Sequence, residues 1–166
     1  IMFNFFKKKF FINFFLILII FCLDRITKNF VISQSKINLS NDLFLSNYLN
    51  ISLMWNEGIA FGLFAFDESF FYNFITILII IVIIIVFFMI LKNEGYKKYS
   101  LILILGGALG NLYDRILFSA VPDFIDFHIG DFHWFVFNVA DIFISIGVII
   151  MILSEFMVTK TSNEEL

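Results

Sequence analysis

Hydrophobic residues are arranged in four long apolar segments separated by more polar connections. The second segment, about 70–91, is an uncharged run long enough to cross a bilayer by itself. The segments at about 10–31, 99–118 and 135–157 reach that length only by including charged or amide side chains. The pattern therefore predicts four transmembrane helices whose polar positions face protein and not lipid.

Basic residues predict how these helices are oriented. The prediction rests on Lys7, Lys8 and Lys9 before the first segment, Lys92, Lys97 and Lys98 between the second and third, and Lys160 after the fourth. Lys and Arg concentrate on the cytoplasmic side of membrane proteins. Both termini are therefore expected in the cytoplasm, and the connections 32–69 and 119–134 on the outer side.

The outer connections predict a small amount of β structure. Residues 50–55 favour a strand, and an Asn56-Glu57-Gly58 turn follows. No internal repeat or change of composition divides the chain, so residues 1–166 are expected to form a single membrane domain. The predicted fold class is a membrane all-α protein with a small β element: four transmembrane helices plus a short extracytoplasmic sheet.

Composition narrows the possible functions. A hydrophobic content of 61% and a mean hydropathy of +0.97 exclude a soluble domain of 166 residues. The 26 Phe residues are interpreted mainly as side chains that face membrane lipids. A net charge of -3 without long basic runs argues against nucleic acid as a partner.

Polar residues inside the apolar segments are the candidates for chemistry. Two segments each carry an Asn-x-x-Asp unit, Asn111 with Asp114 and Asn138 with Asp141, and Asp123 lies on the connection between them. An Asp at the centre of a bilayer costs roughly 2.5–3.5 kcal/mol, so a membrane protein usually keeps one for function. Positions three apart share a helix face, so each Asn is expected to orient its own Asp.

Some of these charges are explained equally well by helix packing. Asp24 and Lys28 are spaced to form an ion pair along the first helix, and Arg115 can pair with the neighbouring Asp114. Buried charges are normally paired in this way. Gly106 and Gly110 form a G-x-x-x-G motif that allows two helix backbones to approach closely.

Asp123 and Asp141 differ because neither has a basic residue beside it. If they meet, like-charge repulsion would leave one carboxyl group protonated and the other ionised. The ionised member could activate water while the protonated member polarises a carbonyl group, which is the chemistry of an aspartic protease.

Metal binding is an alternative function for the connection that contains Asp123. That loop places Asp123, Asp126, His128, Asp131 and His133 within eleven residues. Their spacing matches no helical zinc motif, so the histidines are interpreted as interfacial polar residues, and neither a metal nor another cofactor is predicted.

Two noncatalytic functions also remain open. Intramembrane aspartates occur in transporters and proton relays, although four helices without an inverted repeat are a poor match. In a noncatalytic assembly factor the same aspartates would have a structural role only.

Four sequence blocks resemble those of the lipoprotein signal peptidases, also called signal peptidase II. They occur in the family's order, and the resemblance covers nearly the whole chain. These blocks are Asp24-Arg25-Ile26-Thr27-Lys28, Asn56-Glu57-Gly58-Ile59-Ala60-Phe61, the run from Gly106 to Arg115 continued by Val121-Pro122-Asp123-Phe124, and Phe137-Asn138-Val139-Ala140-Asp141. Arg25 stands where glutamine is common, Pro122 where valine is usual and Ser119 where glycine is frequent.

The resemblance implies an aspartic endopeptidase of the cell (inner) membrane. Such an enzyme removes the signal peptide from diacylglyceryl-modified prolipoproteins, cleaving before the lipidated cysteine at the outer face of the cytoplasmic membrane. It implies Asp123 and Asp141 as the catalytic pair. The residues implied as substrate-binding or supporting are Asp24, Lys28, Asn56, Gly58, Asn111, Asp114, Arg115 and Asn138.

Overall fold

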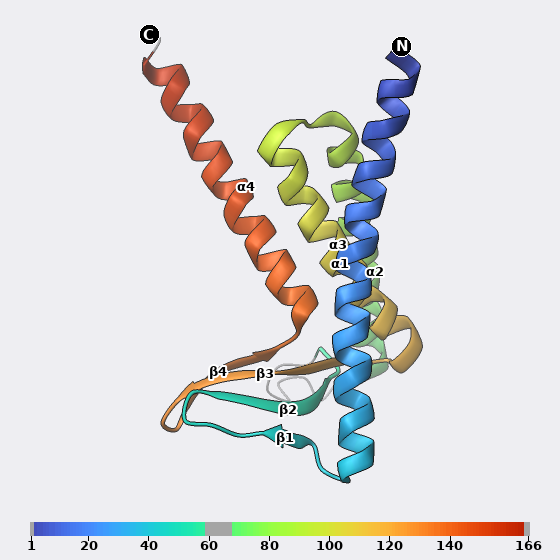
Figure 1. Cartoon of the computed structure of the whole chain (residues 1–166), viewed down its shortest axis with the longest axis vertical. Coiled ribbons are helices and arrows are strands. Elements are labelled where there is room, and N and C mark those ends of the chain that lie inside the picture. Colours follow the sequence, from blue (N-terminus) through green and yellow to red (C-terminus); the bar gives the residue numbers. More distant parts are fainter. Residues whose placement is uncertain (1, 59–67, 165–166) are drawn as a thin grey trace.

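Four long helices stand beside one another, and a small sheet lies across one end of them (Figure 1). The computed structural model describes residues 2–58 and 68–164. In chain order the elements are α1 (Met2–Asn38), β1 (Asp42–Phe44), β2 (Leu49–Asn56), α2 (Glu68–Lys92), α3 (Gly95–Phe118), β3 (Val121–Ile129), β4 (Phe132–Phe137) and α4 (Val139–Glu164). Each helix contains a stretch long and apolar enough to cross a membrane. The predicted fold class is confirmed.

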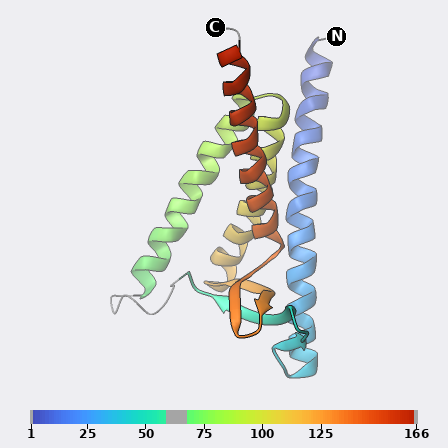
Figure 2. The same cartoon turned by 90° about the vertical axis from the view of Figure 1, so that its left-hand side faces the viewer.

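The two ends of the helix bundle differ in character. The first turn of α1, the last turn of α4 and the connection between α2 and α3 lie at one end (Figures 1 and 2). All four strands lie at the opposite end, in one antiparallel sheet of order β1-β2-β3-β4. The sheet therefore shares one end of the bundle with the start of α4 and the end of α3.

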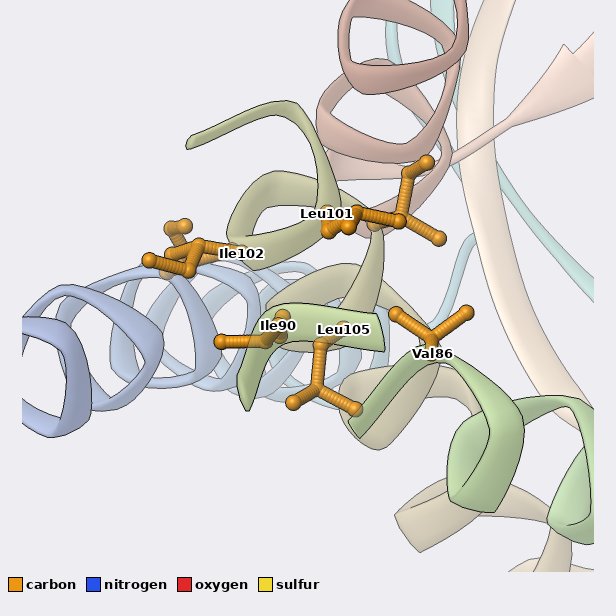
Figure 3. Close-up of a cluster of buried hydrophobic side chains, with 7 residues drawn as sticks. Val86, Ile90, Leu101, Ile102 and Leu105 are labelled. Atoms are coloured by element: carbon orange, nitrogen blue, oxygen red, sulfur yellow. The ribbon is translucent and has the colours of Figure 1, made fainter. Parts of the chain in front are cut away.

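Helix α3 is the most enclosed of the four helices. In its apolar stretch 44% of residues are buried, against 17% or less in the other three. Side chains from three helices form the apolar core around it, five of them labelled in Figure 3. This core consists of Ile20 of α1, Val86 and Ile90 of α2, and Leu101, Ile102, Ile104 and Leu105 of α3. A central α3 can contribute polar side chains toward both α1 and α4.

Glycines on α3 permit these close contacts. A Cβ atom added at Gly110 would lie 2.5 Å from the Asp24 carboxylate in α1, and one added at Gly107 would lie 2.5 Å from the Ala140 carbonyl oxygen in α4. Gly106 lies against Ile20 of α1. The G-x-x-x-G motif therefore packs against α1, as its spacing predicts, while Gly107 serves the α3–α4 contact.

Helix α1 continues to Asn38, seven residues beyond the end that hydropathy suggested. Its last two turns pack against the sheet, because Val31 joins Leu53 of β2 and Phe124 of β3 in a second buried cluster. The Ser35 hydroxyl donates a 2.8 Å hydrogen bond to Asn41 Oδ1 just before β1. The extension fixes the sheet relative to the helices.

The connection 119–134 is largely a β-hairpin that the sequence pattern did not indicate. Strand β3 is buried on both faces over most of its length, so it lacks the polar–apolar alternation of a surface strand. Strand β4 is an apolar run that resembles the start of a helix, and α4 accordingly begins at Val139, four residues later than expected. Pro122 is tolerated because it lies opposite Trp55 of β2, ahead of the residues that pair with β4.

Candidate active site

Asp123 lies near the start of β3, directly opposite Met54 of β2. Its side chain is buried, with 4% of the residue exposed. The amide of Asn56, at the end of β2, donates a 2.9 Å hydrogen bond to Oδ2, and the amide of Asn138 donates a 2.6 Å hydrogen bond to Oδ1. Two asparagines from different elements therefore hold this carboxyl group in one orientation.

Asp141 lies in the first turn of α4 and is held there by the helix cap. Asn138 Oδ1 accepts a 3.2 Å hydrogen bond from the Asp141 backbone N–H, and Asp141 Oδ2 accepts a 3.1 Å hydrogen bond from the Asn138 backbone N–H. This reciprocal pattern is a capping box. Because the Asn138 amide also donates to Asp123, one residue bridges the two carboxyl groups.

Asn111 orients Asp141 instead of the Asp three residues further along its own helix. Its amide donates a 2.8 Å hydrogen bond to Asp141 Oδ1, and its Oδ1 accepts a 2.8 Å hydrogen bond from the ammonium of Lys28. The expectation that Asn111 would orient Asp114 is therefore wrong. Lys28 lies between the two, since its ammonium also contacts Asp114 Oδ2 at 2.7 Å.

A buried charge cluster joins α1 to α3. Asp24, Lys28 and Asp114 are each fully buried, and the predicted Asp24–Lys28 pair forms at 3.0 Å. The guanidinium of Arg25 contacts both oxygens of Asp114 and also Asp24 Oδ2. Asp24 Oδ1 accepts a 3.0 Å hydrogen bond from the backbone N–H of Ala140 at the start of α4. The cluster therefore ties three helices together beside the two aspartates.

Arg115 points to a different part of the site from Asp114. Its guanidinium carbon lies 5.4 Å from the centre of the Tyr72 ring, and the Tyr72 hydroxyl donates a 2.7 Å hydrogen bond to the Arg115 carbonyl. The other side of the guanidinium lies against Gly58, where an added Cβ would be 3.0 Å from Nη1. The expected pairing with Asp114 is replaced by the Arg25 and Lys28 contacts.

The predicted turn at Asn56–Gly58 is present. Asn56 Oδ1 accepts a 2.8 Å hydrogen bond from the Gly58 backbone N–H, and Gly58 has a φ angle of +82°. A positive φ strongly favours glycine. The turn fixes the Asn56 amide so that its nitrogen faces Asp123. Ile59, Ala60 and Phe61 of the same sequence block lie outside the described residues.

The surroundings of Asp123 change its acidity. The pKa of this carboxyl group is raised from 3.8 to about 6, mainly because the group is buried. The hydrogen bonds from Asn56 and Asn138 and the charge of Lys28 act in the opposite direction, and the negative charge of Asp141 contributes to the increase. A carboxyl group with this pKa keeps part of its population protonated near neutral pH. Asp123 can therefore serve as a proton donor beside a second carboxyl group.

An apolar groove of about 360 Å³ leads to Asp141. It lies between the β3–β4 hairpin and the first turns of α4. Its lining consists of Phe127, Trp134, Phe135, Phe137, Asp141, Ile142, Ser145 and Ile146. Asp141 is thus reachable from a surface suited to a hydrophobic ligand, and Asp123 in β3 is not among the residues that line it.

The histidines of the hairpin form a separate cluster. His133 Nδ1 lies 2.8 Å from Asp126 Oδ2, and the His128 and His133 rings stack with their centres 4.8 Å apart. Asp126 also accepts a 3.2 Å hydrogen bond from Asn50. Across the described residues, no group of three or more His, Cys, Asp or Glu side chains has an arrangement that could hold a metal ion.

The fold and this site define a class: multi-pass membrane proteins with a pair of carboxyl groups at one end of the bundle. The profile of the family described as Signal peptidase (SPase) II matches residues 16–157. The chain belongs to this signal peptidase II family.

Relatives named "Lipoprotein signal peptidase" cover almost the whole chain. The protein of Pelagibacter ubique (strain HTCC1062) is 52% identical over 159 residues, which are 95% of this chain and 96% of the relative. That of Anaplasma phagocytophilum (strain HZ) is 38% identical, covering 82% and 86%. A solved structure described as "Bacterial membrane enzyme structure by the in meso method at 2.3 A resolution" is 29% identical with a TM-score of 0.72, covering 91% and 90%.

The structure joins the predicted site residues into one network. Hydrogen bonds connect Asn56, Asp123, Asn138, Asp141, Asn111 and Lys28 in that order. Lys28 also contacts both Asp24 and Asp114, and Gly58 and Arg115 adjoin the Asn56 end of the network. Two residues of this region were missed, Arg25 and Tyr72. Arg25 could have been predicted as part of the site, because it is a third charged residue beside Asp24 and Lys28 in an otherwise apolar helix. Tyr72 could not, because its position near Arg115 depends on how the helices pack.

Proposed function

We propose that this chain is an aspartic endopeptidase that removes the signal peptide from diacylglyceryl-modified prolipoproteins, with Asp123 and Asp141 as the catalytic pair. The observation that carries the proposal is the single residue Asn138, which binds both carboxyl groups beside an apolar groove. Family membership supports the same function. Cleavage before the lipidated cysteine releases the signal peptide and leaves the lipoprotein in the membrane.

The proposed reaction requires only the two carboxyl groups and water. The ionised carboxylate takes a proton from water as the water oxygen attacks the scissile carbonyl carbon, and the protonated carboxyl group gives its proton to the carbonyl oxygen. When the tetrahedral intermediate collapses, the C–N bond breaks and the cysteine nitrogen accepts the proton that the base took from water. One hydroxyl group of the intermediate returns its proton to Asp123 as the carbonyl group re-forms, which restores the pair. The raised pKa of Asp123, about 6, supports its role as the protonated member in the first step.

Neighbouring residues are assigned supporting functions. Asn56 and Asn138 orient Asp123, while Asn111 and Asn138 orient Asp141. Arg115 is proposed to bind a substrate carbonyl, because its Nε and Nη1 have no hydrogen-bond acceptor within the described part of the protein. Lys28, Asp24 and Asp114 hold the helices in register.

The apolar groove is proposed to hold a hydrophobic portion of the substrate. A diacylglyceryl group keeps a prolipoprotein in the membrane, so the scissile bond stays near the lipid–water boundary. A groove lined by Phe127, Trp134 and Ile142 offers such a chain an apolar surface that ends at Asp141. Membrane lipids would compete for the same surface.

The sheet is proposed to face the outside of the cell (inner) membrane, with both termini in the cytoplasm. Lys92 is the last residue of α2, and Lys97 and Lys98 lie in the first turn of α3. The connection between these helices lies at the end of the bundle opposite the sheet (Figure 1), which agrees with the preference of basic residues for the cytoplasmic side. In a chain with Cys22 replaced, a cysteine introduced at Ser46 should react with a membrane-impermeant maleimide added outside sealed cells. Reaction only after the membrane is broken would reverse the orientation.

The test of function is cleavage of a defined substrate by the purified full chain in liposomes. A prolipoprotein carrying the diacylglyceryl group should be cut once, and mass spectrometry should find the lipidated cysteine at the new N-terminus. The same polypeptide without the lipid is the matched control and should remain uncut. Cleavage of both forms at the same rate would contradict the proposed substrate class, and absence of cleavage by the folded chain would contradict the function.

A further inference from the structure

Arg25 is an additional cation in the charge cluster, and the catalytic proposal does not use it. Its Nη2 lies 2.6 Å from Asp114 Oδ2 and 2.7 Å from Asp24 Oδ2, and its Nη1 contacts Asp114 Oδ1. The guanidinium carbon also lies 4.8 Å from the centre of the Tyr113 ring. A bidentate ion pair with an aromatic contact fixes the guanidinium group on three sides.

Arg25 balances the charge of two fully buried carboxylates. Asp24 and Asp114 contribute two negative charges, and Arg25 and Lys28 contribute two positive charges. Without Arg25, Lys28 would be the only cation among the described residues that contacts both acids. An unbalanced charge on buried side chains strongly destabilises the folded protein.

The Lys28 ammonium group contacts three side chains. Its nitrogen forms an ion pair with Asp24 Oδ1 at 3.0 Å, and it donates hydrogen bonds to Asp114 Oδ2 at 2.7 Å and to Asn111 Oδ1 at 2.8 Å. The third contact orients the Asn111 amide, so that its nitrogen faces Asp141. Lys28 can keep this contact because Arg25 supplies the remaining donors to the two acids.

We propose that Arg25 is a positioning residue for catalysis, which acts through Lys28 and Asn111 on the orientation of Asp141. This inference rests on the proposed function. Removal of Arg25 draws the Lys28 ammonium fully onto Asp24 and Asp114 and releases Asn111 Oδ1. The Asn111 amide is then free to rotate, and Asp141 loses its 2.8 Å donor.

The experiment compares Arg25→Met, Asn111→Ala and the double variant in the full chain with the lipid-modified prolipoprotein. Methionine removes the charge and every donor, whereas glutamine, which is common at this position in the family, could still donate to the carboxylates. Misplacement of a catalytic group by about 1 Å can cost about a hundredfold in rate, so Arg25→Met should lower kcat about 10- to 100-fold. KM should stay within about twofold, because Arg25 does not line the groove. If Arg25 acts through Asn111, the double variant should have the kcat of Asn111→Ala alone. Lys97→Met, which removes a cation from the exposed pair with Glu155, is the matched control and should leave kcat unchanged.

Several results would overturn the inference. An unchanged kcat in Arg25→Met, a loss that appears only in KM, or losses that multiply in the double variant would each assign Arg25 a purely structural role. Arg25→Lys covers the case in which Arg25→Met does not fold: it retains the charge but loses the bidentate geometry, and it should show a smaller kcat loss that again disappears in the Asn111→Ala background. Normal cleavage by Arg25→Met refutes this inference alone, whereas no cleavage by folded wild type overturns the proposed function as well.

Discussion

Asp123→Asn and Asp141→Asn are each expected to lower kcat for signal-peptide removal by at least about a hundredfold, the usual scale for loss of a general acid or base. Neither amide can accept a proton from water or donate one to the carbonyl oxygen as a carboxyl group does. Single-turnover cleavage of the lipid-modified substrate in liposomes measures the effect. The double variant should be little slower than either single variant, because the two groups act as a unit.

Asp126→Asn is the matched control for this comparison. Asp126 is a buried aspartate on the same strand as Asp123, and it is held by Asn50 and His133 outside the catalytic network. Its replacement should leave kcat within a few-fold of wild type. Thermal unfolding of all variants verifies that they fold. Retained activity in either folded Asp123→Asn or Asp141→Asn would contradict the assignment of the two aspartates as the catalytic pair.

Lys28→Met is expected to destabilise the protein by about 3–5 kcal/mol, the scale for removing one partner of a buried ion pair. Lys28 is fully buried and contacts Asp24 and Asp114, so its loss leaves two buried carboxylates with Arg25 as their cation. Asn111 loses its orienting contact at the same time. Denaturant unfolding in detergent micelles measures the free energy of unfolding.

The control for this prediction is Lys97→Met. Lys97 also forms an ion pair with an acid, Glu155, at 2.9 Å, but both side chains are substantially exposed. Exposed pairs contribute at most about 1 kcal/mol, so this variant should unfold close to wild type. An equally small effect of Lys28→Met would show that the charge cluster does not stabilise the helix contacts.

The helical part of the fold was predictable because hydropathy and length together determine a membrane span. The Asp24–Lys28 pair was also predictable, since both residues lie on one helix four positions apart. Contacts within a single element follow from its periodicity. The positions of the lysines and of the apolar segments likewise predicted that the carboxylates lie at one end of the bundle. The Asn56-Glu57-Gly58 residues predicted the turn beside them.

Contacts between elements were less accessible to sequence reasoning. Asn111 binds Asp141 and not Asp114, because the rotation of α3 relative to α1 and α4 determines which carboxylate the amide reaches. Arg25 binds Asp114, 89 positions away, for the same reason. Asn138 and Asp141 do interact, but through a helix cap and not across a helix face. The predicted fourth span included residues 135–137, although tertiary packing makes them the end of strand β4.

The most direct test of a water-activating carboxyl pair is a single turnover of wild-type enzyme on the lipid-modified substrate in ¹⁸O-labelled water with EDTA present. The structure predicts full activity with the chelator, and one ¹⁸O atom in the new carboxylate of the released signal peptide. Asp123 and Asp141 should remain unlabelled, because water attacks the substrate directly. Loss of activity with EDTA, or ¹⁸O found in either aspartate with none in the peptide, would contradict the proposed mechanism.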